Sequence, residues 1–275
     1  MSRLRLGVVL LVPGPVASAV DGLRRAFGDP VLDQVAPHVT LVPPVNVKPA
    51  EVAAGLAVLR DAAAATPALE LVLGPVTAFP GDEGVAYLAV RGEDAVMAAL
   101  QRLQSGVFRK PFEREVDHDF VPHVTITQGV DSARLEAVLT ASAGWDGVAV
   151  RIDALHLLEE QHTPAGRRWA PIADVPLGPR TIVGRGGLEL ELTPSVLLDP
   201  EAASAVPDVE LVGASDGLTM VGRLEGEVVG VARGRRGRLQ QVWIGDAQAD
   251  YVRPHLVEAW YHEAERRAGA RPGTA

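Results

Sequence analysis

Apolar and polar positions follow two different periods along the first 178 residues of the chain. Apolar residues at spacings of three and four predict helices, and short apolar or alternating runs predict strands. The helices are expected at 14–27, 50–65, 93–108 and 131–143, the last with Asp131 and Ser132 as N-cap candidates. The strands are expected at 4–12, 35–45, 69–74, 84–90, 121–129, 148–160 and 167–177. The last two strands are expected to form a closing hairpin.

A segment rich in proline and turn residues, PIADVPLGPR at 171–180, interrupts this pattern. Such a segment favours a domain boundary, so we expect one domain at 1–178 and a second at 181–275. In the second domain the pattern predicts, in order, a strand, a hairpin, a strand and an amphipathic helix. These elements are expected at 188–194, 218–234, 239–245 and 253–269, with the hairpin turning at Glu225–Gly226–Glu227.

One tetrapeptide, Pro-His-Val-Thr, occurs twice in the first domain, at 37–40 and at 122–125. Both copies lie in segments that we expect to be strands. Because side chains alternate between the two faces of a strand, the histidine and threonine of each copy point to one face and the valine to the other. The apolar residues can then anchor each strand to a core while the polar pair faces a cleft. If the two halves are related by a pseudo-twofold axis, the two polar pairs meet across it.

These residue types suit the cleavage of a phosphodiester bond. The reaction needs a base to deprotonate the nucleophile and an acid to protonate the leaving oxygen. Imidazole titrates at about pH 6.5, so His38 and His123 can fill both roles near neutral pH. The hydroxyls of Thr40 and Thr125 can donate to the non-bridging oxygens, whose charge must be stabilised in the transition state. This chemistry requires no metal and no other cofactor.

The two His-Val-Thr motifs resemble the paired H-x-T signatures of the 2H phosphoesterase superfamily, which includes 2′,5′-RNA ligase-like proteins and cyclic nucleotide phosphodiesterases. The resemblance covers roughly residues 1–178. It implies an α+β, bilobal fold with two antiparallel sheets around a central cleft. It also implies that His38 and His123 are the acid–base pair and that Thr40 and Thr125 hold the phosphate. Which histidine is the base depends on the reaction direction, because ligase and hydrolase directions share one site.

Other polar residues near the second motif are weaker candidates. Arg109, Lys110 and Arg114 precede it and either contact a substrate phosphate or ribose or form a solvated loop. Tyr87 either stacks on a base or packs in the core. The run 117–119, Asp-His-Asp, suggests either a metal site or an exposed polar turn, and we favour the turn.

The second domain resembles the acetyl-CoA-binding half of a GNAT acetyltransferase, on its hairpin EGEVVGVARG and the strand and helix that follow. In that family a glycine-rich loop cradles the CoA pyrophosphate at the helix N-terminus. The matching stretch here, 248–254, has lost the glycines, carries the negative Asp250 and ends at Pro254, which has no N–H. We therefore expect a small, truncated α/β GNAT-like domain that does not bind acetyl-CoA. Four arginines fit either an RNA contact or a solvated hairpin: Arg233, Arg235, Arg236 and Arg238.

Composition narrows the classes of function. With 47% hydrophobic and 22% charged residues the chain can form real cores, and its lack of cysteine excludes a disulfide scaffold, a thiolate zinc site and a cysteine nucleophile. The net charge of −9 disfavours a broad electrostatic grip on long nucleic acid and leaves room for a local basic cleft. No apolar run reaches the length of a membrane span, so we expect a cytoplasmic protein without membrane contact.

These observations lead to three hypotheses of function. The first is a metal-independent phosphodiesterase that acts on a 2′,3′-cyclic phosphate or a 2′–5′ phosphodiester of nucleotides or RNA ends. The second is a non-catalytic module that binds phosphorylated nucleotides or RNA. The third is an N-acetyltransferase acting through the C-terminal domain. The presence of all four motif residues favours the first hypothesis, and the missing glycine loop argues against the third.

Overall fold

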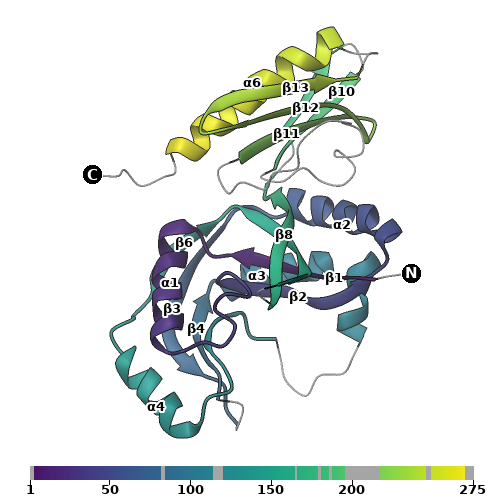
Figure 1. The fold of residues 1–275 in the computed structure, drawn as a ribbon. Helices are drawn as coiled ribbons and strands as arrows, with labels where there is room; N and C mark the ends of the chain where they lie inside the picture. The colour runs from purple at the N-terminus through teal and green to yellow at the C-terminus, as the bar shows by residue number, and fades with distance from the viewer. Residues whose placement is uncertain are drawn as a thin grey trace. The chain divides into compact units, whose positions relative to one another are not determined.

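The structure is a computed structural model that describes residues 3–81, 84–113, 120–164, 166–178, 181–185, 188–195, 217–245 and 249–269. The chain divides into two compact units, Met1–Pro171 (unit 1) and Ile172–Ala275 (unit 2). Figure 1 shows both units and their labelled elements. The domain ranges 1–178 and 181–275 stay a prediction. Across the described part of the chain, no helix is long and apolar enough to span a membrane.

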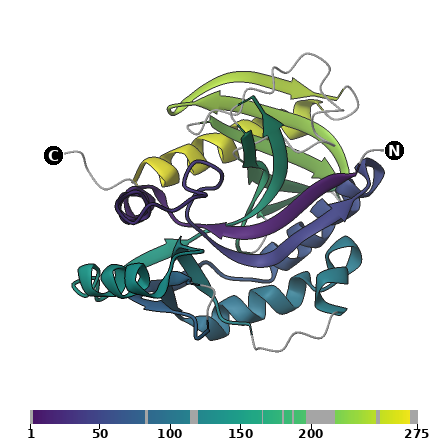
Figure 2. The same cartoon turned by 60° about the horizontal axis from the view of Figure 1, so that its bottom comes forward.

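The first sheet of unit 1 is antiparallel, with the strand order β2-β1-β7-β8. The strands are β1 (Leu4–Leu11), β2 (His38–Val47), β7 (Ala154–Thr163) and β8 (Gly166–Pro176), the last of which begins in unit 1. Strand β1 lies between β2 and β7, and Figure 2 shows it curving alongside β2. Its residues Leu6, Val8, Val9 and Leu10 are all buried. This continuous apolar run is typical of a strand that is covered on both faces.

The second sheet is also antiparallel, with the order β5-β4-β3-β6. Its strands are β3 (Leu69–Ala78), β4 (Ala86–Arg91), β5 (His123–Thr127) and β6 (Val148–Ile152). Strands β2 and β5, which carry the two Pro-His-Val-Thr copies, are therefore each an edge strand of their own sheet. These two edge strands contact each other. The expectation of two antiparallel sheets in the first domain is confirmed.

The expectation of one strand at 148–160 is wrong. The chain leaves the second sheet at Ile152 and enters the first sheet at Ala154, so the segment forms two strands, β6 and β7, on either side of Asp153. Only β7 lies beside β8, so the closing hairpin is right for its later part alone. Buried apolar residues alternate correctly in both strands, and hydrophobic periodicity does not register a change of sheet.

Helices pack against the strands and against one another. The α-helices of unit 1 are α1 (Gly14–Ala26), α2 (Val52–Ala64), α3 (Glu93–Leu103) and α4 (Ser132–Ala141). Short 3₁₀ turns lie at η1 (Pro49–Glu51), η2 (Gly106–Phe108) and η3 (Lys110–Glu113). Helix α2 packs on α3, α1 contacts β5, and α4 contacts β3 and β4.

Two details of these helices bear on the expectations from sequence. The helix expected at 93–108 ends at Leu103, and Gly106 beyond it has a φ of 52°, which an α-helix does not allow. At α4, the side chain of Asp131 accepts a 2.8 Å hydrogen bond from the backbone N–H of Arg134. Asp131 is therefore the N-cap, as expected.

Unit 2 contains a five-stranded antiparallel sheet of order β13-β12-β11-β10-β9 and one long helix, α6 (Ala249–Gly269). The strands are β9 (Thr181–Arg185), β10 (Leu188–Ser195), β11 (Gly217–Leu224), β12 (Glu227–Arg235) and β13 (Arg238–Ile244). Trp260 of α6 is fully buried on this sheet, and its indole N–H donates to the Leu218 carbonyl at 2.9 Å. The expected turn is confirmed, because Glu225 and Gly226 both have positive φ. A second tight turn at Arg236–Gly237 carries the arginine run; β9 was not expected.

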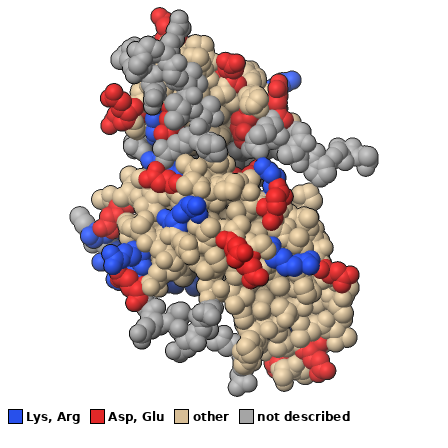
Figure 3. All heavy atoms as spheres, turned by 180° about the vertical axis from the view of Figure 1, so that it is seen from behind, with Lys and Arg blue, Asp and Glu red and all other residues tan. Residues whose placement is uncertain are grey.

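Charged side chains of both signs are spread over the surface. On the face shown in Figure 3, many of the Lys and Arg side chains lie close to Asp or Glu side chains, between larger areas of other residues. This distribution agrees with the net charge of −9. It gives long nucleic acid no broad cationic surface on that face.

Candidate functional site

Both motif strands show the alternation expected from the sequence. The histidine and the threonine of each copy are partly exposed, on the same face of the strand. The apolar residues between and after them are at most 2% exposed: Val39, Leu41, Val124 and Ile126. Burial of these residues anchors β2 and β5 to the core, so the polar pairs His38–Thr40 and His123–Thr125 are left facing outward from it.

The two histidines have the same local hydrogen bond. His38 Nδ1 lies 2.7 Å from the carbonyl oxygen of Ala36, and His123 Nδ1 lies 2.8 Å from that of Val121. A carbonyl oxygen only accepts, so Nδ1 carries the hydrogen in both rings and Nε2 is the nitrogen left for proton transfer. In each copy the acceptor is the residue before the proline of the motif. That residue is held extended by the proline that follows it, which gives the proline a physical role in the motif.

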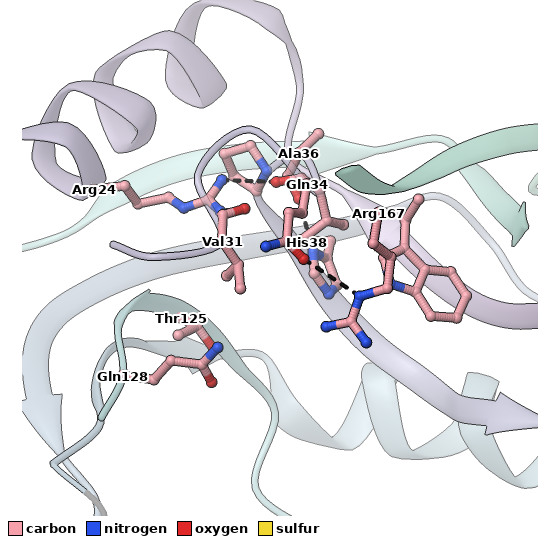
Figure 4. A pocket seen from close by; sticks show the side chains of 11 residues that line it. Arg24, Val31, Gln34, Ala36, His38, Thr125, Gln128 and Arg167 are labelled. Atoms are coloured by element: carbon pink, nitrogen blue, oxygen red, sulfur yellow. Dashed lines mark hydrogen bonds between the residues drawn. The ribbon is translucent and has the colours of Figure 1, made fainter. Parts of the chain in front are cut away.

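A pocket of about 240 Å³ brings the two motif copies together. His38 of β2 and Thr125 of β5 both line it, and Figure 4 shows Thr125 and Gln128 across an open space from His38. The wall beside His38 comes from the loop before β2 and from β8. Its residues are Arg24, Val31, Gln34, Val35, Ala36, Pro37, Arg167 and Trp169.

A second, smaller pocket of about 130 Å³ adjoins the first. The two pockets share Val35, His38 and Trp169. Thr40 lines the second pocket, so His38 stands between a polar space and a mainly apolar one.

His123 is held by aromatic rings and lies outside both linings. Its ring meets Phe79 edge-on, with centroids 4.9 Å apart, and lies 5.4 Å from Tyr87. Phe79 and Tyr87 are themselves stacked at 4.1 Å. Tyr87 is 8% exposed, which fits core packing better than stacking on a base. The aromatic pair instead fixes the orientation of the His123 ring.

Arg24 of α1 ties down the loop that leads into the first motif. Its guanidinium is almost fully buried, donates from Nε to Asp29 at 2.7 Å and pairs with Asp21 at 2.9 Å. The same group donates to the carbonyl oxygens of Val35 at 2.9 Å and Val31 at 3.1 Å. Two carboxylates balance the charge, so the structural effect of Arg24 is to fix the backbone immediately before the Ala36 carbonyl.

Burial lowers the pKa of His38 below its ordinary value, because the charged ring loses solvation. The backbone hydrogen bond to Ala36 works in the opposite direction. The positive charges of Arg24 and of a protonated His123 lower the pKa further. His38 is therefore biased toward the neutral form that can accept a proton.

The cations proposed from the sequence do not line either pocket. Arg109 forms an exposed ion pair with Glu113 at 2.9 Å, and Lys110 is exposed in η3. Arg114 lies outside the described residues, as does the run 117–119. Among the residues that are described, no group of three or more His, Asp or Glu side chains is placed to hold a metal ion.

Several residues of the site were missed by the sequence analysis. Gln34, Gln128, Arg167 and Trp169 line the first pocket. Arg167 Nε donates to Gln34 Oε1 at 3.4 Å, and the Trp169 backbone N–H donates to the Gln34 carbonyl at 2.7 Å. These contacts join the loop before β2 to β8, more than 130 positions later in the chain, and no local pattern marks them.

Comparisons with known proteins place this site in a family. Proteins of Staphylococcus aureus strains Newman and JH1, provisionally named as phosphoesterases, are 30% and 29% identical over 155 residues, covering 56% of this chain and 88% of theirs. The crystal structures of TT0787 of Thermus thermophilus and of E. coli LigT complexed with 3′-AMP are 19% and 17% identical, with TM-scores of 0.47 and 0.46. They match 63% and 64% of this chain and 97% and 99% of their own. The sequence profile of the 2′-5′ RNA ligase superfamily matches residues 12–164, more than half of the chain. The chain therefore belongs to the 2′-5′ RNA ligase superfamily, the 2H phosphoesterases.

Proposed function

We propose that residues 1–178 act as a metal-independent phosphodiesterase on a 2′,3′-cyclic phosphate or a 2′–5′ phosphodiester of a nucleotide or RNA end. One observation carries this proposal: each edge strand presents a histidine whose Nδ1–H is held by a carbonyl two residues earlier. Both Nε2 atoms are then available for proton transfer, and His38 shares one pocket with Thr125 of the other motif copy. The provisional phosphoesterase name of the Staphylococcus aureus relatives agrees with this function.

For a cyclic phosphate, hydrolysis needs two proton transfers around one phosphorus. One imidazole takes a proton from water as the water oxygen bonds to phosphorus. The bond from phosphorus to the 2′ or 3′ oxygen then breaks, and the other, protonated imidazole gives its proton to that oxygen. The product is a phosphate monoester, and the two rings have exchanged protonation states. The threonine hydroxyls of the two motif copies donate to the non-bridging oxygens.

The surroundings of the two rings favour one division of roles. The lowered pKa of His38 keeps that ring neutral at neutral pH, which is the form that accepts a proton. His38 is therefore the base in our proposal for the hydrolytic direction, and His123, oriented by Phe79 and Tyr87, is the acid. In the reverse direction microscopic reversibility exchanges these roles.

The test is product formation from adenosine 2′,3′-cyclic phosphate in the presence of EDTA. The proposal expects a phosphate monoester to accumulate at the same rate with and without the chelator. The second hypothesis, a non-catalytic binding module, expects the nucleotide to raise the Tm of the protein while no product forms. A rate that falls to zero in EDTA and returns with added divalent metal would contradict metal independence.

For residues 181–275, the GNAT likeness without cofactor binding also remains a proposal. It is supported by Asp250 in the first turn of α6 and by Pro254 inside that helix. An acidic residue at a helix N-terminus opposes a bound pyrophosphate there. Acetyl-CoA is therefore expected to leave the Tm of the protein unchanged, and a concentration-dependent rise in Tm would overturn this view.

A further inference from the structure

The second pocket has no part in the two proton transfers. Apart from His38 and Thr40 at its edge, the side chains that line it are apolar. They come from three neighbouring strands of the first sheet, from the loop before β2 and from β8. The apolar members are Gly7, Val9, Val35, Val42, Pro44, Leu158 and Trp169.

Gly7 forms part of this pocket without being required by its own backbone. It lies inside β1 and is not among the glycines with positive φ. A Cβ atom at this position would meet the Val42 carbonyl oxygen at 3.4 Å and Trp169 Cζ3 at 3.9 Å, both ordinary contact distances. A β-branched residue would suit a strand interior better than glycine does. The missing side chain instead leaves free space beside the indole of Trp169.

The position of Trp169 is fixed through its backbone. Its N–H donates to the Gln34 carbonyl at 2.7 Å, so the side chain is not needed for that link. The residue lines both pockets, next to His38 in each. It therefore offers an aromatic surface at the boundary between the polar and the apolar space.

We propose that this second pocket holds the nucleobase of the substrate whose phosphate lies beside His38 and Thr125. The inference rests on the proposed function, since it takes the reacting phosphate to belong to a nucleotide. A volume of about 130 Å³ is well below the lower end of about 300 Å³ for drug-sized ligand sites, so the pocket suits one ring system rather than a whole nucleotide. The adjoining pocket of about 240 Å³ leaves room for the sugar and the phosphate.

Apolar walls also define how the base is recognised. The polar side chains of this pocket, His38 and Thr40, belong to the motif that handles the phosphate. The base is therefore held by stacking and apolar contact, which tolerate any base because every base has a π-face. The site accepts adenine and uracil alike and discriminates against a cyclic phosphate that has no base.

The test compares kcat/KM for adenosine and uridine 2′,3′-cyclic phosphate with kcat/KM for glycerol 1,2-cyclic phosphate, which lacks a base. Stacking on an aromatic side chain predicts that wild type prefers both nucleosides by about 5- to 100-fold. Gly7→Val, which fills the pocket, and Trp169→Ala are expected to reduce that preference toward one. Trp169→Phe keeps an aromatic ring and is expected to retain most of it.

Each outcome bears on a different claim. If wild type hydrolyses the nucleosides and the glycerol compound equally well, the base pocket is overturned while the phosphodiesterase stands. The base pocket is also overturned if Gly7→Val and Trp169→Ala fold with the wild-type Tm and leave the preference unchanged. Because the wild-type preference requires no variant, poor folding of either variant does not remove the test. If wild type hydrolyses none of these compounds, the proposed function fails, and the base pocket fails with it.

Discussion

Arg24 and Asp29 form an ion pair inside unit 1, with Arg24 Nε 2.7 Å from Asp29 Oδ2 and side chains that are 3% and 0% exposed. The same guanidinium holds the carbonyls of Val31 and Val35, just before the first motif. A helix side chain thereby sets the backbone that carries the acceptor for His38. The position of the proposed base thus depends on a buried charge pair that does not itself touch the reacting atoms.

Removing Asp29 is expected to be costly. Asp29→Ala leaves the Arg24 charge buried with Asp21 as its remaining carboxylate, so the free energy of unfolding should fall by about 3 kcal/mol or more in urea denaturation. Arg109→Ala breaks an exposed ion pair and is the matched control, with an expected change within about 1 kcal/mol. Equal effects of the two substitutions would show that the buried pair has no special weight.

Stability should depend on pH through His38. Its pKa is lowered in the folded protein, so the unfolded chain binds more protons and stability rises with pH across that window. The contribution is complete above about pH 6.5, the ordinary histidine value, and is lost as the pH falls toward the folded pKa. His38→Gln is expected to lose less free energy of unfolding than wild type on going from about pH 7.5 to about pH 5. Parallel losses in the two proteins would contradict the lowered pKa.

The same lowered pKa predicts the shape of the rate profile. If neutral His38 is the base, kcat/KM for a nucleoside 2′,3′-cyclic phosphate falls on the acid side with a midpoint below about pH 6.5. Initial rates measured across the acid range locate this midpoint. A midpoint clearly above the ordinary histidine value would assign the limb to another group and exchange the proposed roles of the two rings.

Thr125 is expected to contribute through its hydroxyl. Thr125→Val removes a donor to the phosphate and should lower kcat by about 10²-fold, while Thr125→Ser keeps the donor and most of the rate. Thr127, two residues on, provides a control, because its hydroxyl is buried with no hydrogen-bond partner among the described residues. Thr127→Val should leave kcat unchanged and be neutral or stabilising. Equal losses of kcat at positions 125 and 127 would remove the special role of Thr125.

Two arginines separate the interpretation of the sequence from that of the structure. Arg167 lines the pocket, whereas Arg109 lies outside both linings in an exposed ion pair. Arg167→Met is therefore expected to raise KM for a nucleotide substrate, because a cation beside the phosphate is lost, and to weaken the salt dependence of KM. Arg109→Met should change neither. The opposite result would favour the loop that the sequence pattern indicated.

The sequence predicted the parts of this site that depend on local pattern. Two copies of one tetrapeptide, each in an alternating run, were enough to place His38, Thr40, His123 and Thr125 on outward faces of two strands. The alternation was reliable because Val39 and Val124 must reach the core, which fixes the register of each strand.

Long-range parts of the site could not be predicted in this way. Gln34 and Arg167 are neighbours only because the loop before β2 meets β8. The break at Asp153 was missed because both flanking strands keep the same alternation while they join different sheets. Arg24 gave no signal either, since a single arginine in an amphipathic helix is usually solvated. Its burial follows from two carboxylates and two carbonyls that the fold gathers around it.

The central claim is that two imidazoles, one from each motif copy, perform the chemistry. The most direct measurement is kcat for adenosine 2′,3′-cyclic phosphate in EDTA, for wild type, His38→Ala, His123→Ala and His162→Ala. His162 is an exposed histidine near the end of β7 and serves as the matched control. The account predicts that each motif variant loses about 10²–10⁴-fold in kcat with an unchanged Tm, while His162→Ala keeps the wild-type rate. Full activity in either motif variant would contradict the two-histidine mechanism.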